Sequence, residues 1–278
     1  MIQHLACVMD GNRRWATSRG LPTLFGHKQG VTAVRTVVTF CLQRSISYLS
    51  LYTFSLENFK RSFEEKSYLF NLIDEVLQQV AQDLVGQGVR IRFVGDRALF
   101  PESVRASCLA IEQATVHGDK LQLNILFCYG GRQEIVSSVK KIAEQVASGT
   151  LSPDAITQEH LQNNLWMPNI PDPDLIIRTG AVHRMSNFLL FQSAYSELIF
   201  FDCMWPDMTE ALFEQALHEF NARERRCKDP EVNRYQLLMR TRHKRTLPIE
   251  PAKKPTKGIA TEEPLKNAVC DPRIKLIL

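Results

Sequence analysis

Short apolar runs alternate with longer segments of helical periodicity along most of this chain. The apolar runs carry aromatic and β-branched residues and end at polar or glycine positions, which is typical of buried strands. The predicted strands cover residues 5–9, 48–54, 89–94, 121–128, 174–178 and 196–201. The predicted helices cover residues 28–43, 63–85, 101–117, 132–147, 153–165 and 209–226.

Strands that are separated by helices predict right-handed crossovers between parallel strands. We therefore expect an α/β fold with a mostly parallel central sheet sandwiched by helices. The predicted helix over 63–85 has one apolar face, which should be buried. That face consists of Leu69, Leu72, Ile73, Val76, Leu77 and Val80.

Charge divides the chain into two parts. Residues 228–278 hold 12 basic and 6 acidic residues, whereas residues 1–227 hold 22 basic and 24 acidic residues. The tail also carries several prolines and no clear helical or strand pattern, so we expect one folded domain at 1–227 and a basic, poorly ordered tail at 228–278. A nucleic-acid-binding role for the tail is disfavoured because no nucleic-acid module is recognisable.

Composition and motifs exclude several classes of protein. The chain is 44% hydrophobic and 23% charged, which is globular composition. Its apolar runs are too short to span a bilayer, and no signal peptide opens it. The seven cysteines include no CxxC pair, so buried reduced thiols are expected rather than zinc or disulfide sites.

Candidate chemistry lies at the carboxyl ends of three predicted strands, where parallel sheets bind ligands. The first end carries Asp10 and Gly11, followed by Arg13 and Arg14. A carboxylate can hold a divalent cation there, and arginines can bind phosphate oxygens. A plain Asp-Gly turn with solvated arginines is an equally good interpretation of this segment alone.

The second and third strand ends are weaker signals on their own. Residues 55–61 combine a hydroxyl, an amide, two cations and an aromatic ring, but an exposed polar loop would look similar. Arg178, Arg184 and Ser186 surround a glycine and suit a diphosphate, although a structural ion-pair loop is also possible. Together the three ends favour condensed phosphate with Mg²⁺ as the ligand class. The chain has no P-loop and no dinucleotide-binding glycine motif.

These motifs match a known family in their order along the chain. The chain closely resembles the cis-prenyltransferase (isoprenyl transferase) family, and within it most the bacterial undecaprenyl diphosphate synthases. The matching segments are HLACVMDGNRRWA from residue 4, GHK from 26, YTFSLENF from 52, NI from 124 with YGGR from 129, DLIIRTG from 174, and RMSNFLL from 184 with YSEL from 195. The all-helical trans-prenyl synthases use DDxxD motifs, and none occurs here.

The resemblance implies a Mg²⁺-dependent enzyme that condenses isopentenyl diphosphate onto an allylic diphosphate such as farnesyl diphosphate with cis geometry. The product would be a long polyprenyl diphosphate held in an apolar tunnel, the undecaprenyl lipid carrier precursor for cell-wall glycan synthesis. The helix over 63–85 would line this tunnel, with Leu121 and Leu123 at its floor.

The resemblance also implies roles for individual residues. Asp10 and Asn58 would be catalytic, with Ser55 and Asn58 relaying the departing proton, and Asp10 and Glu197 would bind Mg²⁺. The allylic diphosphate would be held by Gly11, Asn12, Arg13, Arg14 and His27. The diphosphate of isopentenyl diphosphate would be held by Arg178, Arg184 and Ser186. The remaining implied substrate-binding residues are Trp15, Leu56, Glu57, Phe59, Arg61 and Met185.

The chain departs from the family at several positions. Family members carry a glutamate where this chain has Val182, and they commonly end soon after the equivalent of Arg226. A non-catalytic subunit that supports a partner chain is the alternative, but such subunits typically lack the strand-end aspartate and the first arginine pair. We expect a cytoplasmic homodimer that touches the membrane peripherally to discharge its product.

Overall fold

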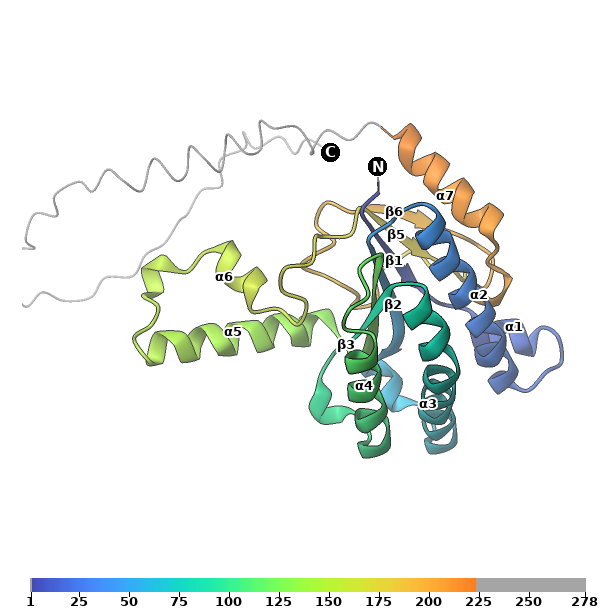
Figure 1. Cartoon of the computed structure of the whole chain (residues 1–278), viewed down its shortest axis with the longest axis horizontal. Coiled ribbons are helices and arrows are strands. Elements are labelled where there is room, and N and C mark those ends of the chain that lie inside the picture. Colours follow the sequence, from blue (N-terminus) through green and yellow to red (C-terminus); the bar gives the residue numbers. More distant parts are fainter. Residues whose placement is uncertain (1, 224–278) are drawn as a thin grey trace, which may run out of the picture. The chain divides into compact units, whose positions relative to one another are not determined.

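The fold is built around a six-stranded sheet in which every strand pair is parallel (Figure 1). The computed structural model describes residues 2–223, apart from the side chains of residues 73, 74, 76–83 and 103, so the expected tail at 228–278 lies outside the described residues. The strand order is β3-β4-β2-β1-β5-β6. The strands are β1 His4–Val8, β2 Tyr48–Ser55, β3 Val89–Val94, β4 Leu121–Tyr129, β5 Leu175–Arg178 and β6 Glu197–Phe200.

Helices and short 3-10 turns connect the strands. The α-helices are α1 Asn12–Thr17, α2 Thr23–Gln43, α3 Phe63–Gly86, α4 Glu102–Ala114, α5 Gly131–Ala147, α6 Gln158–Asn163 and α7 Glu210–Ala222. The 3-10 helices are η1 Leu56–Lys60, η2 Arg97–Leu99, η3 Pro153–Ala155 and η4 Trp205–Asp207. The predicted α/β fold with a parallel sheet is confirmed.

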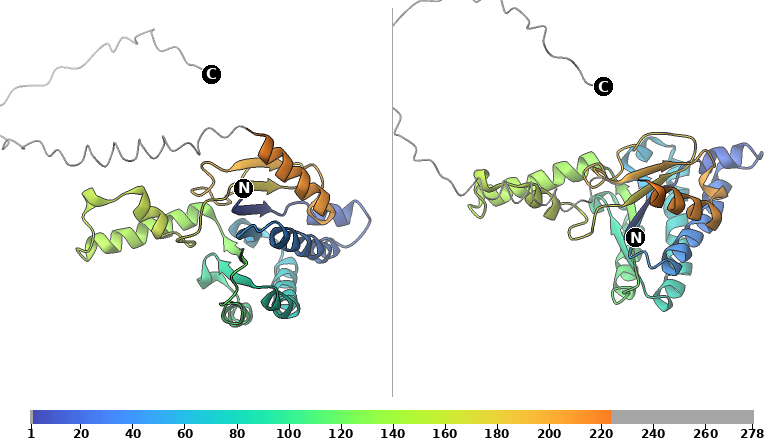
Figure 2. Two further views of the ribbon diagram at one scale, coloured as in Figure 1. Left: turned by 45° about the horizontal axis from the view of Figure 1, so that its top comes forward. Right: turned by 90° about the horizontal axis from the view of Figure 1, so that it is seen from above.

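The two faces of the sheet are covered differently. The larger apolar core lies between one face and helices α2, α3, α4 and α7. The other face packs against irregular segments through Met167, Ile170, Phe188 and Leu189. Helices α5 and α6 extend away from the sheet, on the side opposite α1 and α2 (Figures 1 and 2). Only one helical layer therefore lies close against the sheet.

Central position explains why the inner strands were predictable. Every residue of β1 and of β5 is buried. Strands buried on both faces are continuous apolar runs, and both segments have that pattern. β1 pairs with β2 on one side and with β5 on the other, which brings segments far apart in the sequence together.

The helical predictions were less accurate at the ends. α1 was not predicted, because six residues are too few for a helical repeat. It packs against α2, where a side-chain carbon on Gly26 would lie 1.9 Å from the Asn12 carbonyl oxygen. α2 begins at Thr23 rather than at residue 28, directly after Pro22. The predicted helix over 153–165 is instead the turn η3 followed by the short α6.

Two further features concern membrane spans and cysteines. Among the described residues, no helix is both long and apolar enough to cross a membrane. Cys7, Cys41, Cys108 and Cys128 are buried and, like Cys203, form no disulfide. Cys227 and Cys270 lie outside the described residues.

Candidate active site

The carboxyl ends of β1, β2 and β5 meet around a polar cavity of about 500 Å³. Ten predicted site residues line it, from all three strand ends and from α2. They are Asp10, Asn12, His27, Ser55, Glu57, Asn58, Arg61, Arg178, Arg184 and Ser186. The rest of the lining was not predicted and consists of Val8, Met9, Tyr52, Thr53 and Asn187.

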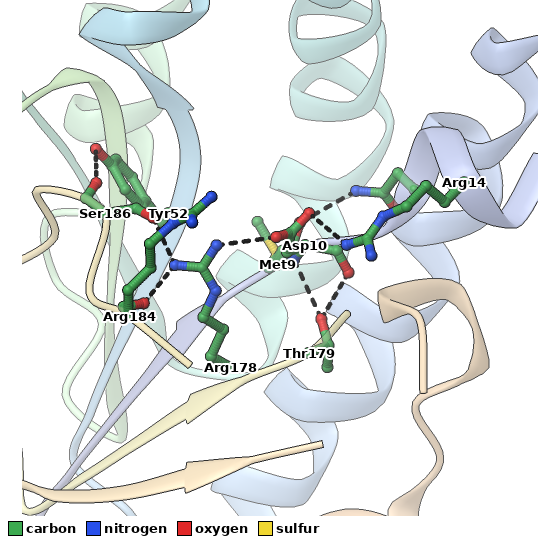
Figure 3. Close-up of polar contacts among 9 residues, drawn as sticks. Met9, Asp10, Arg14, Tyr52, Arg178, Thr179, Arg184 and Ser186 are labelled. Carbon is green, nitrogen blue, oxygen red and sulfur yellow. Dashed lines mark hydrogen bonds and ion pairs between the residues drawn. The ribbon is translucent and has the colours of Figure 1, made fainter. Parts of the chain in front are cut away.

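Asp10 is fixed by its backbone and presents its carboxylate to the cavity. Its N–H donates to Thr179 Oγ1 over 3.1 Å, and the Thr179 hydroxyl donates back to its carbonyl over 2.7 Å. Arg178 Nη2 lies 2.9 Å from one carboxylate oxygen and Arg14 Nη2 lies 3.3 Å from the other (Figure 3). The side chain stays 33% exposed. Asp10 is therefore held in place but remains accessible to a ligand.

Gly11 makes the turn after Asp10 possible. Its φ of 104° is in the left-handed region that favours glycine. A side-chain carbon there would lie 2.5 Å from Met204 Sδ. The glycine lets α1 begin immediately after the strand, which brings Arg14 back to Asp10 one turn later.

Arg178 connects Asp10 to the loop over residues 184–186. Its guanidinium is only 6% exposed. Nη1 donates to Ser186 Oγ over 2.7 Å and to the Arg184 carbonyl, while Nη2 reaches Asp10 (Figure 3). Because the Arg184 side chain is exposed on the cavity, it can meet an incoming anion.

The segment after β2 folds into η1, and the side chain of Asn58, a predicted catalytic residue, stabilises this turn. Asn58 Oδ1 accepts a hydrogen bond from the Ser55 N–H over 3.0 Å. The amide oxygen of Asn58 is thus engaged by the backbone. The Ser55 and Asn58 side chains nevertheless both line the cavity.

Glu65 contacts three predicted site residues but was not itself predicted. Its carboxylate lies 2.8 Å from Arg61, 3.6 Å from Arg13 and 3.8 Å from His27. Only 13% of the side chain is exposed. Arg61 and Glu65 are four residues apart, a spacing at which opposite charges pair on a helix, and this signal could have identified Glu65.

His27 stands between these charges as a neutral group. Burial is the main cause that lowers the pKa of His27 to about 4, and the nearby Arg61 lowers it further. Its Nε2 is buried without a hydrogen-bond partner. The 3.8 Å approach to Glu65 is therefore a contact of an uncharged ring at neutral pH rather than an ion pair.

Several predicted residues lie outside the cavity lining. The Trp15 indole N–H donates to Asp207 over 2.7 Å, and the guanidinium of Arg19 lies 4.2 Å above its ring. Phe59 packs edge-on against Phe54 in the larger core. Five more predicted residues are next to cavity residues in the sequence but do not line the cavity. They are Gly11, Arg13, Arg14, Leu56 and Met185.

Glu197 is not brought to Asp10 within this chain. It is the first residue of β6 and pairs in register with Leu175, at the amino end of β5. Asp10 follows the carboxyl end of β1, at the opposite edge of the same parallel sheet. The Glu197 carboxylate instead lies 2.8 Å from Arg223. Among the described residues, no cluster of three or more acidic, histidine or cysteine side chains could hold a metal ion.

A smaller apolar cavity of about 140 Å³ adjoins the polar one. Met9, Asn12, His27 and Thr53 line both. Its apolar walls come from α2, α3, the sheet and η4, and consist of Val31, Val34, Leu51, Leu69, Leu72, Ile125 and Trp205. Leu69 and Leu72 are thus where the tunnel prediction expected them. Leu121 and Leu123 are buried in the core but do not line this cavity.

The rest of the predicted tunnel wall lies on α3 beyond Leu72. The side chains of Ile73, Val76, Leu77 and Val80 lie outside those described.

A buried glutamate supports the chain behind the cavity. Glu134 on α5 accepts hydrogen bonds from Tyr129 Oη at 2.5 Å, Gln192 Nε2 at 3.0 Å and the Trp166 N–H at 3.0 Å. Its side chain is fully buried, and burial raises its pKa. This network ties the 189–192 segment, which follows the Ser186 loop, to the base of α5.

Comparison with known proteins agrees with this geometry. Residues 8–228 match the sequence model of a protein family described as "Putative undecaprenyl diphosphate synthase". The chain belongs to the undecaprenyl diphosphate synthase family. Membership makes it a prenyltransferase and confirms the resemblance seen in the sequence.

Individual relatives cover most of the chain. A farnesyl-diphosphate-specific ditrans,polycis-undecaprenyl-diphosphate synthase of Salmonella paratyphi A is 45% identical over 224 residues, which is 81% of this chain and 89% of the relative. An isoprenyl transferase of Thermotoga maritima is 42% identical over 81% of this chain and 95% of its own length.

A solved structure shares the fold. Lavandulyl diphosphate synthase from Lavandula x intermedia, in complex with dimethylallyl diphosphate, superposes with a TM-score of 0.79 at 31% identity. The match covers 81% of this chain and 97% of that one. The predicted cis-prenyltransferase fold is confirmed.

Proposed function

We propose that this family member condenses isopentenyl diphosphate repeatedly onto farnesyl diphosphate to give a long cis-polyprenyl diphosphate, the undecaprenyl lipid carrier precursor for cell-wall glycan synthesis. The observation that carries the proposal is the adjacency of the two cavities. A polar cavity with one accessible carboxylate and several arginines suits diphosphates, and the apolar cavity behind it suits a prenyl chain.

Different segments of the site would bind the two diphosphates. Residues of the turn after β1, of α1 and of α2 would hold the allylic diphosphate. These are Gly11, Asn12, Arg13, Arg14 and His27. Arg178, Arg184 and Ser186 would hold the diphosphate of isopentenyl diphosphate, since Arg178, at the end of β5, donates to the Arg184 carbonyl and to the Ser186 hydroxyl. Trp15, Leu56, Phe59 and Met185 would support these segments from outside the cavity.

Magnesium fits the donor set around Asp10. Mg²⁺ commonly takes only one or two carboxylates and completes its shell with substrate phosphates and water. One accessible carboxylate beside phosphate-binding arginines meets that requirement. When bound, Mg²⁺ would stabilise the negative charge that develops on the leaving diphosphate. Glu197 lies too far along the sheet to share that ion within one chain.

The reaction exchanges one bond for another. The allylic carbon loses its bond to diphosphate oxygen, and the C4 carbon of isopentenyl diphosphate forms a bond to it. A proton then leaves as the cis double bond forms. Ser55 and Asn58 line the cavity where this proton would depart. Because the Asn58 oxygen already accepts the Ser55 N–H, the Ser55 hydroxyl is the better-placed carrier.

A product-size assay tests the proposed function. Purified protein with farnesyl diphosphate, labelled isopentenyl diphosphate and Mg²⁺ should give long labelled polyprenyl products, and EDTA should abolish them. Asp10→Ala should abolish transfer, while Asp154→Ala, at an exposed carboxylate on η3, should not. An unchanged rate in Asp10→Ala would contradict the catalytic assignment of Asp10. No transfer by the parent protein would favour the alternative of a non-catalytic subunit, which the names of the relatives do not favour.

We also propose that the protein is a homodimer formed through α5. This helix extends from the sheet (Figure 2). It exposes Val136 and Val139, with 54% and 51% of their surfaces accessible. Two valines three residues apart share one helix face, and a second copy would bury them. Sedimentation should show a dimer that dissociates in the Val136→Asp/Val139→Asp variant. A dimer that survives would contradict this interface.

Peripheral membrane contact would solve the problem of releasing a long apolar product. Phe25 and Phe63 are 55% and 76% exposed on the first turns of α2 and α3, beside the cavity residues His27 and Arg61. We propose that these rings touch the cytoplasmic surface of the membrane. Liposome flotation should weaken in Phe25→Ser/Phe63→Ser, whereas retention equal to the parent protein would count against the contact.

The catalytic domain is proposed to span residues 1–227, because the family match ends at residue 228.

A further inference from the structure

We propose that Asn187 is a positioning residue that sets the affinity for isopentenyl diphosphate without binding it. The inference rests on the proposed function, because it concerns the loop that would hold that substrate. Asn187 follows Ser186 directly and joins three separate segments of the chain.

Asn187 uses its whole side-chain amide for these connections. Its Oδ1 accepts the backbone N–H of Arg132 over 2.8 Å, at the amino end of α5. Its Nδ2 donates to Glu57 Oε1 over 2.9 Å and to Gln133 Oε1 over 3.1 Å. Its carbonyl accepts the Gly131 N–H over 2.7 Å. The Ser186 loop is thereby fastened both to α5 and to η1.

The backbone of the loop needs such fastening. Ser186 and Asn187 have φ values of 51° and 65°, in the left-handed region that non-glycine residues rarely adopt. Such residues persist only where surrounding contacts hold them. On the other side of the contact, a side-chain carbon on Gly130 would lie 2.7 Å from Asn187 Nδ2. Gly130 therefore permits the close approach that the amide requires.

The direction of the Glu57 hydrogen bond gives Asn187 its specific chemistry. Glu57 lines the cavity that would receive diphosphates, and a neutral amide can donate to it without adding charge. An aspartate at position 187 would retain the acceptor for the Arg132 N–H and suit the helix terminus. It would lose the donor and set two carboxylates against each other. The substitution thus disturbs the η1 connection, whereas the hydrogen bonds from the Arg132 and Gly131 N–H groups of α5 remain and only the Gln133 bond on that side loses its donor.

The loop carries this disturbance to the proposed substrate groups. Ser186 Oγ accepts a hydrogen bond from Arg178, and the next residue, Asn187, donates one to Glu57. If the Glu57 carboxylate repels a carboxylate at position 187, Ser186 and Arg184 move relative to Asp10, whereas the groups on α1 and α2 are untouched. Isopentenyl diphosphate should be affected and the allylic substrate should not.

Binding and kinetics together test the proposal. Isothermal titration with isopentenyl diphosphate alone and with farnesyl diphosphate alone is compared for the parent protein, Asn187→Asp and Asn187→Gly. Steady-state KM for each substrate and kcat are measured with Mg²⁺. The matched control is Asn169→Asp, because Asn169 also has a left-handed φ, of 64°, and lies outside the cavity.

The expected pattern separates positioning from folding. Asn187→Asp should weaken isopentenyl diphosphate binding and raise its KM about tenfold or more, since it replaces a hydrogen bond by repulsion. Farnesyl diphosphate binding and the melting temperature should match the Asn169→Asp control. Asn187→Gly should show a smaller increase. In the double variant Glu57→Gln/Asn187→Asp, the introduced glutamine amide can donate to the new carboxylate, so part of the affinity should return.

Two results overturn the inference. One is unchanged isopentenyl diphosphate affinity in Asn187→Asp. The other is an equal loss for both substrates with a lowered melting temperature, which indicates a purely structural role. If the parent protein binds both diphosphates but transfers no prenyl group, the proposed function is wrong and the titrations still decide the role of Asn187. If it binds neither, both proposals are wrong.

Discussion

Replacing Arg178 by lysine tests whether the planar guanidinium organises the site. Its two terminal nitrogens act in different directions, one toward Asp10 and the other toward Ser186 and the Arg184 carbonyl. A lysine keeps the positive charge but has one nitrogen, which cannot occupy both positions. Arg178→Lys therefore breaks at least one of the two connections without removing the charge.

The size of the effect follows from these contacts. A hydrogen bond to a charged group contributes about 1.5 to 3 kcal/mol. Lost in the transition state, that is a decrease of roughly 10- to 150-fold in kcat/KM at 1.36 kcal/mol per factor of ten. Because Asp10 is 33% exposed, water partly compensates for its share, so we expect the lower half of this range.

The assay is steady-state prenyl transfer with each substrate varied in turn, accompanied by thermal melting. Arg19→Lys is the control, because Arg19 lies over Trp15 outside the cavity. The control should retain the parent rate. A folded Arg178→Lys protein within threefold of the parent would refute the idea that bridging by one guanidinium organises the site.

Three further outcomes concern stability. Glu134→Ala leaves the buried side chains of Tyr129 and Gln192 and the part-buried Trp166 N–H without an acceptor. It should lower the free energy of unfolding by about 3 to 5 kcal/mol in urea titration, unlike the exposed-site control Glu144→Ala. Burial lowers the pKa of His4 to about 4. The unfolded chain therefore binds a proton at His4 below pH 6.5, whereas the folded protein binds it only near pH 4. Stability should be full above pH 6.5 and fall by up to about 3 kcal/mol toward pH 4, a slope that should flatten in His4→Gln. Gly26→Ala should displace α1 and cost about 1 to 3 kcal/mol, and an unaltered melting temperature would contradict that close helix contact.

Much of the fold was predictable because its inner strands are buried on both faces. β1 and β5 contain few polar residues, so their continuous apolar runs identified them. The same reasoning failed for α1, whose six residues have no apolar repeat and depend on contact with α2. Tertiary contact decides whether such a short segment is helical, and sequence periodicity does not record that contact.

The site was predictable where residues follow a strand end and less so elsewhere. Asp10 and Arg178 end strands that are neighbours in the sheet, so topology brings them together. Glu197 is the second residue of the last predicted strand, 196–201, and the first residue of β6, so it lies toward the edge of the sheet opposite Asp10. Its role as a magnesium ligand stays a prediction. Asn187 gave no signal of its own, because its partners come from distant segments.

The contact between Asp10 and Arg178 also has a consequence for synthesis of the protein. The two residues are 168 positions apart, and β1 lies between β2 and β5. At ribosomal rates of about 5 to 20 residues per second, roughly 10 to 30 s pass between the two residues. During that time β1 has one unpaired edge and Asp10 lacks its main partner. A nascent chain stalled before residue 178 should therefore be open to strand addition by other chains and to proteases, whatever the stability of the finished enzyme.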